Sequence, residues 1–426
     1  MTYTEALDYI HGVSWTFCKP GLDRITELCA SLGNPQDSLK FVHVAGTNGK
    51  GSFSSMLSSI LCESGLKVGL FTSPYILEFN ERMRINGENI PNDTLAKITA
   101  RVKPIADAMK DKPTEFELIT AIALEYFKDE AVDLVVFECG LGGRLDSTNV
   151  IKTPLLSVIT GIALDHVAFL GDTVEKIALE KAGIIKHGIP VLYGGEDELA
   201  ASVIKSEAEK KNAPFSRTNY SELHIRSKKL SGTEFDYCEW HNMRIKLLGM
   251  YQPKNASLVL DAVDILKPAI PSITEDAVRK GLAKASWRAR FEIISDDPML
   301  IFDGAHNSQG INAAVESIKE YFNEEKVVAI SGVLKDKDYR EIAGKISEVC
   351  DIAFTITPEN PRALSAKEYA DELKANGVFA TPTDCVKDAL TQAIALAKSD
   401  TRRIVCLGSL YTYCEILPEL EAVKKA

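Results

Sequence analysis

Residues 41–52 read Phe-Val-His-Val-Ala-Gly-Thr-Asn-Gly-Lys-Gly-Ser, and this stretch decides the fold of the first half of the chain. Residues 41–45 predict a buried strand, residues 46–52 predict a glycine-rich loop, and the apolar spacing of residues 53–61 predicts a helix. In a strand–loop–helix unit, backbone N–H groups and the helix N-terminus bind phosphate. The sequence therefore predicts a phosphate-binding loop in which Lys50 reaches the β- and γ-phosphates.

This loop departs from the common pattern Gly-x-x-x-x-Gly-Lys-Ser/Thr in two ways. Gly46 stands four residues before Lys50 instead of six, and Gly51 precedes Ser52. A plain glycine turn before a packed helix is the weaker interpretation, because a lysine between two glycines has no packing role. The predicted nucleotide-binding residues of the loop are Gly46, Thr47, Asn48, Gly49, Lys50, Gly51 and Ser52.

Further β-type runs alternate with helical patterns, which is typical of parallel sheets with helical crossovers. Strands are predicted at residues 67–71, 133–138 and 155–160, and in the second half at 300–303, 327–331, 352–357 and 403–407. Runs at 223–226, 235–237 and 243–247 predict a small antiparallel sheet, and helices are predicted at 308–320, 365–376 and 384–398. We therefore expect an α/β fold with two domains. The first, residues 1–296, is a P-loop ATPase domain with a parallel sheet and the small sheet appended. The second, residues 297–426, is a Rossmann-like α/β domain that begins where a polar run ends in proline.

Composition narrows the class of protein. The net charge of −11 disfavours a nucleic-acid surface, which needs a basic stripe. The longest apolar run, residues 155–164, is short of the roughly 20 residues of a membrane helix, and the N-terminus shows no secretory signal. The nine cysteines are scattered and odd in number, so we expect no disulfide framework and a cytoplasmic location.

Polar residues stand where predicted strands end, the edge at which α/β sheets bind ligands. Glu138 ends a buried-type strand, as a magnesium ligand near a nucleotide would. His166 follows another strand, where a hydrogen-bonded structural histidine is the commoner case. Ser73 lies in a Thr-Ser-Pro run that is ordinary turn chemistry. Asp303 precedes a predicted helix and fits a helix cap as well as a ligand.

Lys181 is predicted on a helix that begins at Asp172, with Glu175 as its capping-box partner. From the residues alone, a surface or salt-bridged lysine is the favoured interpretation. The glycine-rich run at residues 140–146 lacks the spacing of a dinucleotide-binding loop, and we reject that interpretation.

Taken together, these runs form an ordered set that covers nearly the whole chain. Its members lie at residues 45–52, 72–74, 79–82, 138–149, 164–166, 180–184, 252–256, 290–292, 303–307 and 408–411. The set resembles the folylpolyglutamate synthases, Mur-ligase-type enzymes that often also serve as dihydrofolate synthases. Tyr75 and Tyr251 stand where many members carry histidine, Arg288 and Ala289 replace a usual Pro-Gly, and Ser308 replaces a frequent proline.

The resemblance implies an ATP-dependent amide ligase that adds L-glutamate to the carboxylate of a folate, or of dihydropteroate, through an acyl phosphate. It implies ATP and two Mg²⁺ ions, with Lys50, Lys181 and His306 as catalytic residues. For ATP it adds Asn255, Arg290 and Asp303 to the loop, and for the metal it names Ser73, Glu138, His166 and a carbamylated Lys181. The implied folate or pteroate site comprises Gly21, Leu22, Phe116, Glu117, Leu118, Ile119, Leu145, Asp146 and Ser147. Arg82, His306 and Ser409 are implied near the incoming glutamate or the β- and γ-phosphates.

Three alternatives stay open. Another Mur-type amino-acid ligase would share the phosphate loop without the folate runs. A P-loop kinase would stop at phosphorylation, and a nucleotide switch would consume no glutamate; the chain lacks the Asn-Lys-x-Asp guanine motif. We expect small-molecule substrates, a monomer, and no nucleic-acid or membrane partner.

Overall fold

The computed structural model describes residues 1–12 and 21–425, which form two compact units. Unit 1 comprises Met1–His224, Asp236–Arg244 and Lys254–Ala285; unit 2 comprises Ile225–Phe235, Ile245–Pro253 and Ser286–Ala426. The chain therefore passes between the units several times. The predicted domain division between residues 296 and 297 stays a prediction.

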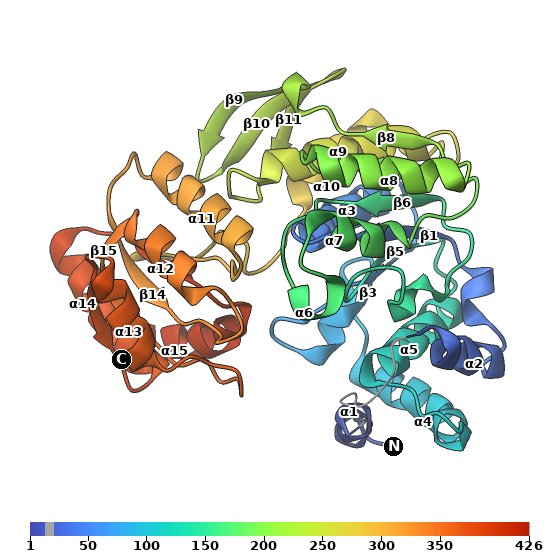
Figure 1. Ribbon diagram of the computed structural model, residues 1–426, viewed down its shortest axis with the longest axis horizontal. Coiled ribbons are helices and arrows are strands. Elements are labelled where there is room, and N and C mark those ends of the chain that lie inside the picture. Colours follow the sequence, from blue (N-terminus) through green and yellow to red (C-terminus); the bar gives the residue numbers. More distant parts are fainter. Residues whose placement is uncertain (13–20, 426) are drawn as a thin grey trace. The chain divides into compact units, whose positions relative to one another are not determined.

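Unit 1 is built on an eight-stranded sheet with the order β4–β3–β2–β5–β1–β6–β7–β8 (Figure 1). Its strands are β1 (Phe41–Ala45), β2 (Val68–Phe71), β3 (Met83–Ile85), β4 (Glu88–Asn89), β5 (Leu134–Glu138), β6 (Leu156–Ile159), β7 (Val191–Tyr193) and β8 (Phe215–Arg217). The six strands from β2 to β8 in this order are parallel, whereas β3 and β4 are antiparallel additions at one edge. The four strands predicted in this half are confirmed. The others have two or three residues each, too few to give an apolar pattern.

Helices cover the sheet of unit 1 on both faces. They are α1 (Tyr3–His11), α2 (Asp23–Ser31), α3 (Lys50–Glu63), α4 (Asn92–Ala108), α5 (Glu115–Asp129), α6 (Val167–Leu170), α7 (Val174–Ala182), α8 (Glu198–Lys210), α9 (Gln252–Leu266) and α10 (Glu275–Lys284). Helix α3 contacts β2 and β5, and α10 packs against α3. On the face that carries Phe41 and Ala45, one buried cluster includes α4 and α5, and a second includes α7 and α8. The loops at the carboxyl ends of the parallel strands carry the predicted site.

A three-stranded sheet, β11–β10–β9, has residues in both units. Its strands are β9 (Leu223–Lys229), β10 (Gly232–Tyr237) and β11 (Trp240–Ile245). This confirms the small appended sheet. The predicted third strand is placed too late, because the polar residues at the start of β11 hide it from an apolar pattern.

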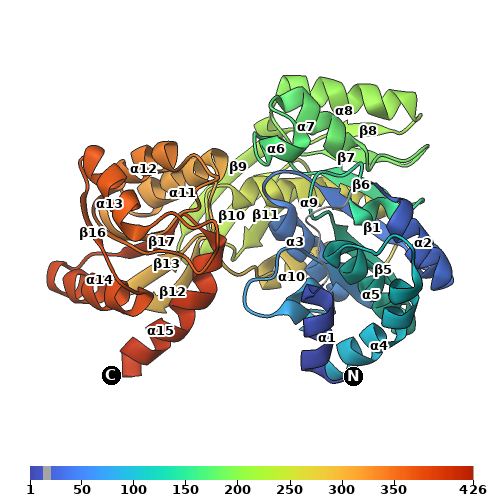
Figure 2. The same cartoon turned by 60° about the horizontal axis from the view of Figure 1, so that its bottom comes forward.

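Unit 2 contains a six-stranded sheet with the order β12–β13–β17–β14–β15–β16, in which the β12–β13 pair alone is antiparallel. Its strands are β12 (Glu292–Asp296), β13 (Met299–Phe302), β14 (Val327–Ser331), β15 (Cys350–Thr355), β16 (Phe379–Pro382) and β17 (Ile404–Leu407). Its helices are α11 (Ser308–Tyr321), α12 (Tyr339–Ser347), α13 (Ala366–Ala375), α14 (Val386–Asp400) and α15 (Tyr413–Lys425). Figure 2 shows α11, α12 and α13 on one face and α14 and α15 on the other, which confirms the second α/β domain type.

The structure tests three further predictions, on a helix cap, the cysteines and membrane-spanning helices. The predicted cap of α7 is wrong: Thr173 is the N-cap residue, and its hydroxyl accepts a hydrogen bond from the Lys176 N–H at 3.3 Å. All eight cysteines that the structure describes are free. Within the described residues, no helix combines the length and the apolar character needed to cross a bilayer.

Candidate active site

The glycine-rich loop between β1 and α3 has a backbone that admits no side chain at two positions. Gly46 has a φ of +148°, and a Cβ there would lie 2.0 Å from the Thr160 hydroxyl oxygen. Gly49 has a φ of +87°, and a Cβ there would lie 2.8 Å from the side-chain oxygen of Asn255. The loop therefore packs closely against Thr160, which follows β6, and against Asn255 of α9. This contact places Asn255 of α9 beside the phosphate loop.

Thr160 is a residue of this site that sequence reasoning missed. Its hydroxyl donates to the Asn48 carbonyl at 2.6 Å, and the Thr47 N–H donates to the Gly161 carbonyl at 2.8 Å. These bonds fix the shape of the loop from the neighbouring strand. A threonine at the end of an apolar strand was the available signal, but nothing local in the sequence shows which loop it touches.

Lys50 opens α3, so its backbone lies at the positive end of a helix dipole. Its Nζ donates to the carbonyls of Gly46 at 3.0 Å and of Thr47 at 3.3 Å. The ammonium group is thus folded over its own loop, at the place where phosphate oxygens would be bound by the loop N–H groups. The geometry fits the predicted role of Lys50.

Lys181 is buried, with 4% of its surface exposed, and its Nζ donates to the same Gly46 carbonyl at 2.8 Å. The surface interpretation that the sequence favours is therefore wrong. Burial, and then the neighbouring Lys50 ammonium, lowers the pKa of Lys181 to about 7. At neutral pH a large share of this side chain is a neutral amine, which is the nucleophilic form of lysine.

The predicted metal ligands lie at one edge of the sheet. Strands β2, β5, β1 and β6 are parallel neighbours, so the ends that carry Ser73, Glu138 and His166 face the same side as the phosphate loop. Glu138 is 3% exposed, whereas the His166 side chain is 46% exposed. His166 is the N-cap residue of α6, with a φ of +51°. The described residues hold no cluster of three His, Cys, Asp or Glu side chains suited to a metal. A carboxylate and a hydroxyl still fit Mg²⁺, because Mg²⁺ uses few protein ligands and keeps waters and phosphate oxygens.

Arg82 lies beside Ser73. Its Nη1 donates to the Ser73 hydroxyl oxygen at 3.0 Å, and its guanidinium lies 5.1 Å from the ring centre of Tyr75 and 5.8 Å from that of Phe79. Tyr75, one of the departures from the family pattern, thus supports a cation next to a predicted metal ligand.

The implied folate residues come together from α2, α5 and the loop after β5. Arg24 of α2 forms a 2.9 Å ion pair with Glu117, and the hydroxyl groups of Thr120 and Ser147 lie 2.6 Å apart. A Cβ on Gly140 would lie 2.5 Å from the ring of Phe116. Segments that are far apart in the sequence therefore form one group in unit 1.

Within this group, the residues differ in exposure. Leu145 is 36% exposed, and Phe116, Gly21 and Leu22 are partly buried. Leu118 and Ile119 are at most 1% exposed and belong to the core beneath. Asp146, Ser147 and Glu117 are buried, and each forms hydrogen bonds within the chain.

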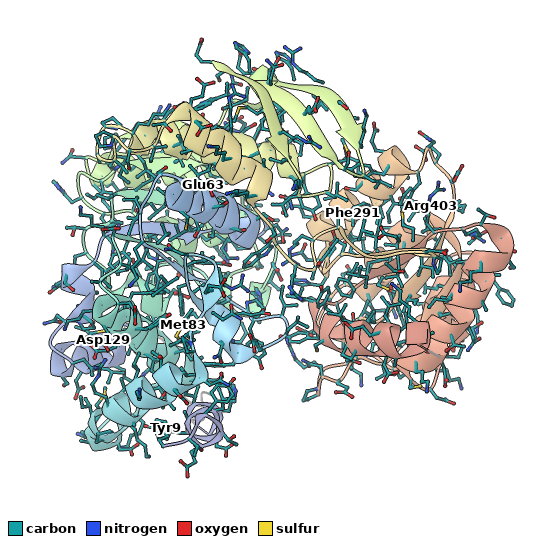
Figure 3. The ribbon with its side chains drawn as sticks, turned by 180° about the vertical axis from the view of Figure 1, so that it is seen from behind. Tyr9, Glu63, Met83, Asp129, Phe291 and Arg403 are labelled. Carbon is teal, nitrogen blue, oxygen red and sulfur yellow. The ribbon has the colours of Figure 1, made fainter. Side chains whose placement is uncertain are left out.

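In unit 2, the Asp303 carboxylate is buried and hydrogen-bonded within its own unit. It accepts from the Tyr251 hydroxyl at 2.8 Å, from the Phe291 N–H at 3.0 Å and from the Ala305 N–H at 2.8 Å; Phe291 is labelled in Figure 3. Burial raises the pKa of Asp303, and the nearby Arg290 opposes this rise. Tyr251 is a second residue whose role the sequence did not reveal, although it was singled out as a departure.

The remaining predicted residues of unit 2 lie on chain segments next to Asp303. A Cβ on Gly304 would lie 2.6 Å from the Arg290 Nη1, and the His306 Nδ1 lies 2.8 Å from the Gly304 carbonyl oxygen. Ser409 is 1% exposed and caps the short helix at Leu410–Thr412, and the N–H of Gly408 beside it donates to the Ala305 carbonyl at 3.0 Å. Arg290, Asp303, His306 and Ser409 therefore form a second group at the carboxyl edge of the second sheet.

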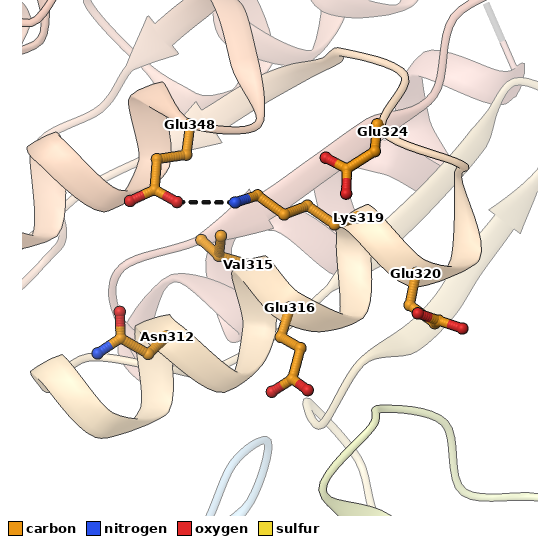
Figure 4. A pocket seen from close by; sticks show the side chains of 7 residues that line it. All are labelled: Asn312, Val315, Glu316, Lys319, Glu320, Glu324 and Glu348. Carbon is orange, nitrogen blue, oxygen red and sulfur yellow. Dashed lines mark hydrogen bonds and ion pairs between the residues drawn. The ribbon is translucent and has the colours of Figure 1, made fainter. Parts of the chain in front are cut away.

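A pocket of about 280 Å³ on α11 lies outside both groups (Figure 4). Its lining is mostly acidic, and Lys319 is paired with Glu348 at 2.8 Å across it. None of the predicted site residues lines this pocket.

Two family models match the chain, one in each half. The Mur ligase middle domain matches residues 44–263, and the Mur ligase glutamate ligase domain matches residues 289–410. The chain belongs to the Mur ligase family.

The relatives narrow this class. The chain is 38% identical to the dihydrofolate synthase/folylpolyglutamate synthase of Bacillus subtilis, over 98% of this chain and 99% of that protein. A crystal structure of folylpolyglutamate synthase from Thermotoga maritima matches with a TM-score of 0.84 at 33% identity, over 99% of this chain and 97% of the other. An FPGS–AMPPCP–folate complex matches with a TM-score of 0.83 at 34% identity, over 100% of both chains. Within the Mur ligases, the chain falls among the folylpolyglutamate and dihydrofolate synthases.

Proposed function

We propose that this chain uses ATP to join the amine of L-glutamate to the carboxylate of a folate, and that dihydropteroate is a second acceptor. The observation that carries the proposal is the convergence of Lys50 and the buried Lys181 on the Gly46 carbonyl, inside a phosphate loop. The folate-bound relative matches the chain over its full length, which supports the acceptor class.

The reaction has two steps. An oxygen of the folate carboxylate attacks the γ-phosphorus of ATP, the bond to the β-phosphate oxygen breaks, and ADP leaves. The glutamate amine then attacks the acyl phosphate carbon, loses a proton, and inorganic phosphate leaves as the amide forms. Loop N–H groups and Lys50 hold the negative oxygens in place during the first step, which depends mainly on positioning and charge. We assign Asn255, Arg290 and Asp303 to ATP, and Arg82, His306 and Ser409 to the glutamate or the terminal phosphates.

We propose that Ser73, Glu138 and His166 hold Mg²⁺. When bound, Mg²⁺ would neutralise charge on the phosphate oxygens. The buried Glu138 carboxylate and the Ser73 hydroxyl supply the oxygen donors that this ion prefers.

We also propose that Lys181 is carbamylated. Its neutral amine would add to the carbon of CO₂ and release one proton, which turns a cation into a carboxylate beside the phosphate loop. Three facts support this: the side chain is buried, its pKa is lowered to about 7, and it lies on the same carbonyl as Lys50. The resulting negative charge would favour a second Mg²⁺ at this point.

The other untested expectations complete the proposal. Gly21, Leu22, Phe116 to Ile119 and Leu145 to Ser147 would form the folate side, with the core residues among them acting as its support. We propose that the protein is a monomer in the cytoplasm and that its domains divide between residues 296 and 297. Sedimentation at working concentrations measures the oligomeric state directly.

The test is ADP and phosphate release with tetrahydrofolate, dihydropteroate or a muramyl precursor, each with L-glutamate, D-glutamate or no amino acid. We expect release that requires L-glutamate and either pterin acceptor. Release with the muramyl precursor alone would indicate another Mur-type ligase, and release without any amino acid would indicate a kinase. Either result contradicts the proposal.

A further inference from the structure

A histidine lies in the middle of β1, where neighbouring strand residues are apolar. His43 is fully buried, and it points to the same face as Phe41 and Ala45 because alternate residues of a strand share a face. Its Nε2 lies 2.9 Å from the Thr148 hydroxyl oxygen and 3.2 Å from the Cys139 sulfur. Its Nδ1 has no hydrogen-bond partner among the described residues. A buried polar atom without a partner is unfavourable, so the imidazole calls for a role that an apolar residue could not fill.

The Thr148 hydroxyl continues the chain of hydrogen bonds. It donates to the Asp146 Oδ1 at 2.5 Å, and the Thr148 N–H donates to the same oxygen at 3.0 Å. The Thr148 hydroxyl has two acceptors within reach, the Asp146 Oδ1 and, at 3.3 Å, the Cys139 sulfur; its single proton goes to Asp146, because the carboxylate oxygen is nearer and is the stronger acceptor. The Thr148 oxygen is then free to accept, and His43 must be the donor, with its proton on Nε2. Burial, and then Lys186, lowers the pKa of His43 to about 3, which agrees with a neutral ring.

Asp146 connects the two ends of the 140–150 loop. Its Oδ2 accepts from the Leu141 N–H at 2.8 Å, near the start of the loop, while its Oδ1 accepts from Thr148 near the end. Between them, the Arg144 N–H donates to the Glu180 carbonyl at 2.7 Å, next to Lys181. The conformation of this loop therefore depends on the direction in which the Asp146 carboxylate points.

We propose that His43, acting through Thr148, is a positioning residue: it fixes the Asp146 carboxylate and with it the folate side of the active site. This inference rests on the proposed function for its kinetic consequence. Its structural part, a relay from the phosphate-loop strand to the 140–150 loop, does not depend on the substrate.

The main variant is Thr148→Val, which keeps the shape and removes the hydroxyl, and Thr148→Ser restores the hydroxyl. We expect Thr148→Val to raise the KM for tetrahydrofolate about tenfold, the size of one lost charge-assisted hydrogen bond, with the KM for ATP unchanged. Thr148→Ser should return the KM for folate to within about twofold of wild type, since the bond to Asp146 is restored. The matched control is Thr355→Val in unit 2, another fully buried threonine whose hydroxyl donates to a carbonyl, that of Ala366, at 2.7 Å. It should lose stability without any change in the KM for folate.

His43 itself is tested by His43→Leu and by the double variant with Thr148→Val. If His43 acts through Thr148, the double variant should have the same KM for folate as Thr148→Val alone. Additive effects, or an equal rise in the KM for ATP, would overturn the relay.

Two measurements need no activity and separate this inference from the proposed function. The ¹⁵N shifts of His43 should show a proton on Nε2 and none on Nδ1 from pH 5 to pH 8, in line with its lowered pKa. Hydrogen exchange at the Leu141 and Thr148 amides should be faster in Thr148→Val than in Thr148→Ser. A proton on Nδ1, or equal exchange in the two variants, would refute the relay even if the enzyme uses folate; an enzyme inactive with folate but showing both signals would refute only the function.

Discussion

The charged groups after β1 in unit 1 and after β13 in unit 2 differ in their hydrogen-bond partners. After β1, the Lys50 and Lys181 nitrogens both donate to the Gly46 carbonyl, and neither forms an ion pair with a carboxylate in the part of the chain that the structure describes. After β13, the Asp303 carboxylate accepts three hydrogen bonds from its own unit. The Lys50 ammonium is held only by neutral carbonyls and keeps its charge available for an anion, and the buried Lys181 amine, with its pKa lowered to about 7, stays available for reaction. A carboxylate with three internal donors fixes the backbone around it. The first group therefore presents its nitrogens to a ligand, whereas the Asp303 carboxylate of the second group is held in a fixed position by its own unit, near Arg290.

Among the variants that test this comparison, we expect the largest loss of activity from a change at Lys50. Lys50→Ala removes the cation that faces the phosphate oxygens, so kcat should fall about 10²-fold or more, on the order of 3 kcal/mol of transition-state stabilisation. Thermal unfolding should stay close to wild type. The matched control is Lys176→Ala, because Lys176 is exposed and its ion pair among the described residues is with Asp172, at 2.7 Å. Normal turnover in Lys50→Ala would remove the phosphate-loop assignment.

Lys181 variants test the same group, because a carbamylated Lys181 would carry a negative charge there. Lys181→Ala should bind ATP but lose amide formation by about 10²-fold, since a metal-side carboxylate is lost. Acetate should restore part of the rate by occupying the vacated space. Lys181→Arg should stay inactive, because a guanidinium stays cationic. Full activity of Lys181→Arg would return this residue to a purely cationic role.

The pH dependence of Lys181 follows from its lowered pKa. Below about pH 7 the folded amine is protonated, as it is in the unfolded chain, and it cannot add to CO₂. Between about pH 7 and the ordinary lysine pKa of 10.5, the unfolded chain binds a proton that the folded chain does not, so this group makes the free energy of unfolding rise with pH. With ¹³C-labelled bicarbonate, a carbamate signal should be stronger at pH 8 than at pH 6 and absent from Lys181→Arg. The same signal in that variant would place the carbamate elsewhere.

Glu138 should give a smaller effect that depends on the metal concentration. Glu138→Gln keeps the shape of the buried side chain but removes the charge that favours a hard cation. We expect activity to fall about tenfold at low Mg²⁺ and to recover in part as Mg²⁺ is raised. A Mg²⁺ dependence equal to wild type would leave Glu138 with a structural role only.

The smallest effect tests the other side of the comparison. Tyr251→Phe removes one of three donors to the buried Asp303 and should lower the free energy of unfolding by about 1–2 kcal/mol, measured with denaturant. Tyr321→Phe is the matched control in the same cluster. The buried Tyr321 hydroxyl has no hydrogen-bond partner among the residues that the structure describes, and its ring stacks on Phe291 with centroids 5.4 Å apart. Removal of that hydroxyl should cost nothing. Equal losses in the two variants would show that Asp303 does not depend on Tyr251.

The sequence by itself determined the parts that depend on neighbouring residues. The strand before Gly46, the glycine loop and helix α3 are continuous in the chain, so apolar spacing and glycine placement fixed them. The same holds for Glu138 at the end of β5 and for the alternation of strands and helices that defines both α/β sheets. The ordered runs added the family, because their combination is far more specific than any one of them.

Only the tertiary structure decided what depends on distant residues. Lys181 looks like a surface lysine in its helix, and its burial follows from the packing of that helix against the loop after β5 and the phosphate loop. Three contacts of the site join residues that are 52 to 114 positions apart in the sequence. They are Thr160 with Gly46, Tyr251 with Asp303, and His43 with Thr148. Short strands such as β7 and the edge strand β8 are held by their neighbours and not by their own pattern. A local pattern determines which face of a helix or strand is apolar. The packing between elements determines which polar groups come into contact, and the chemistry of this site depends on those contacts.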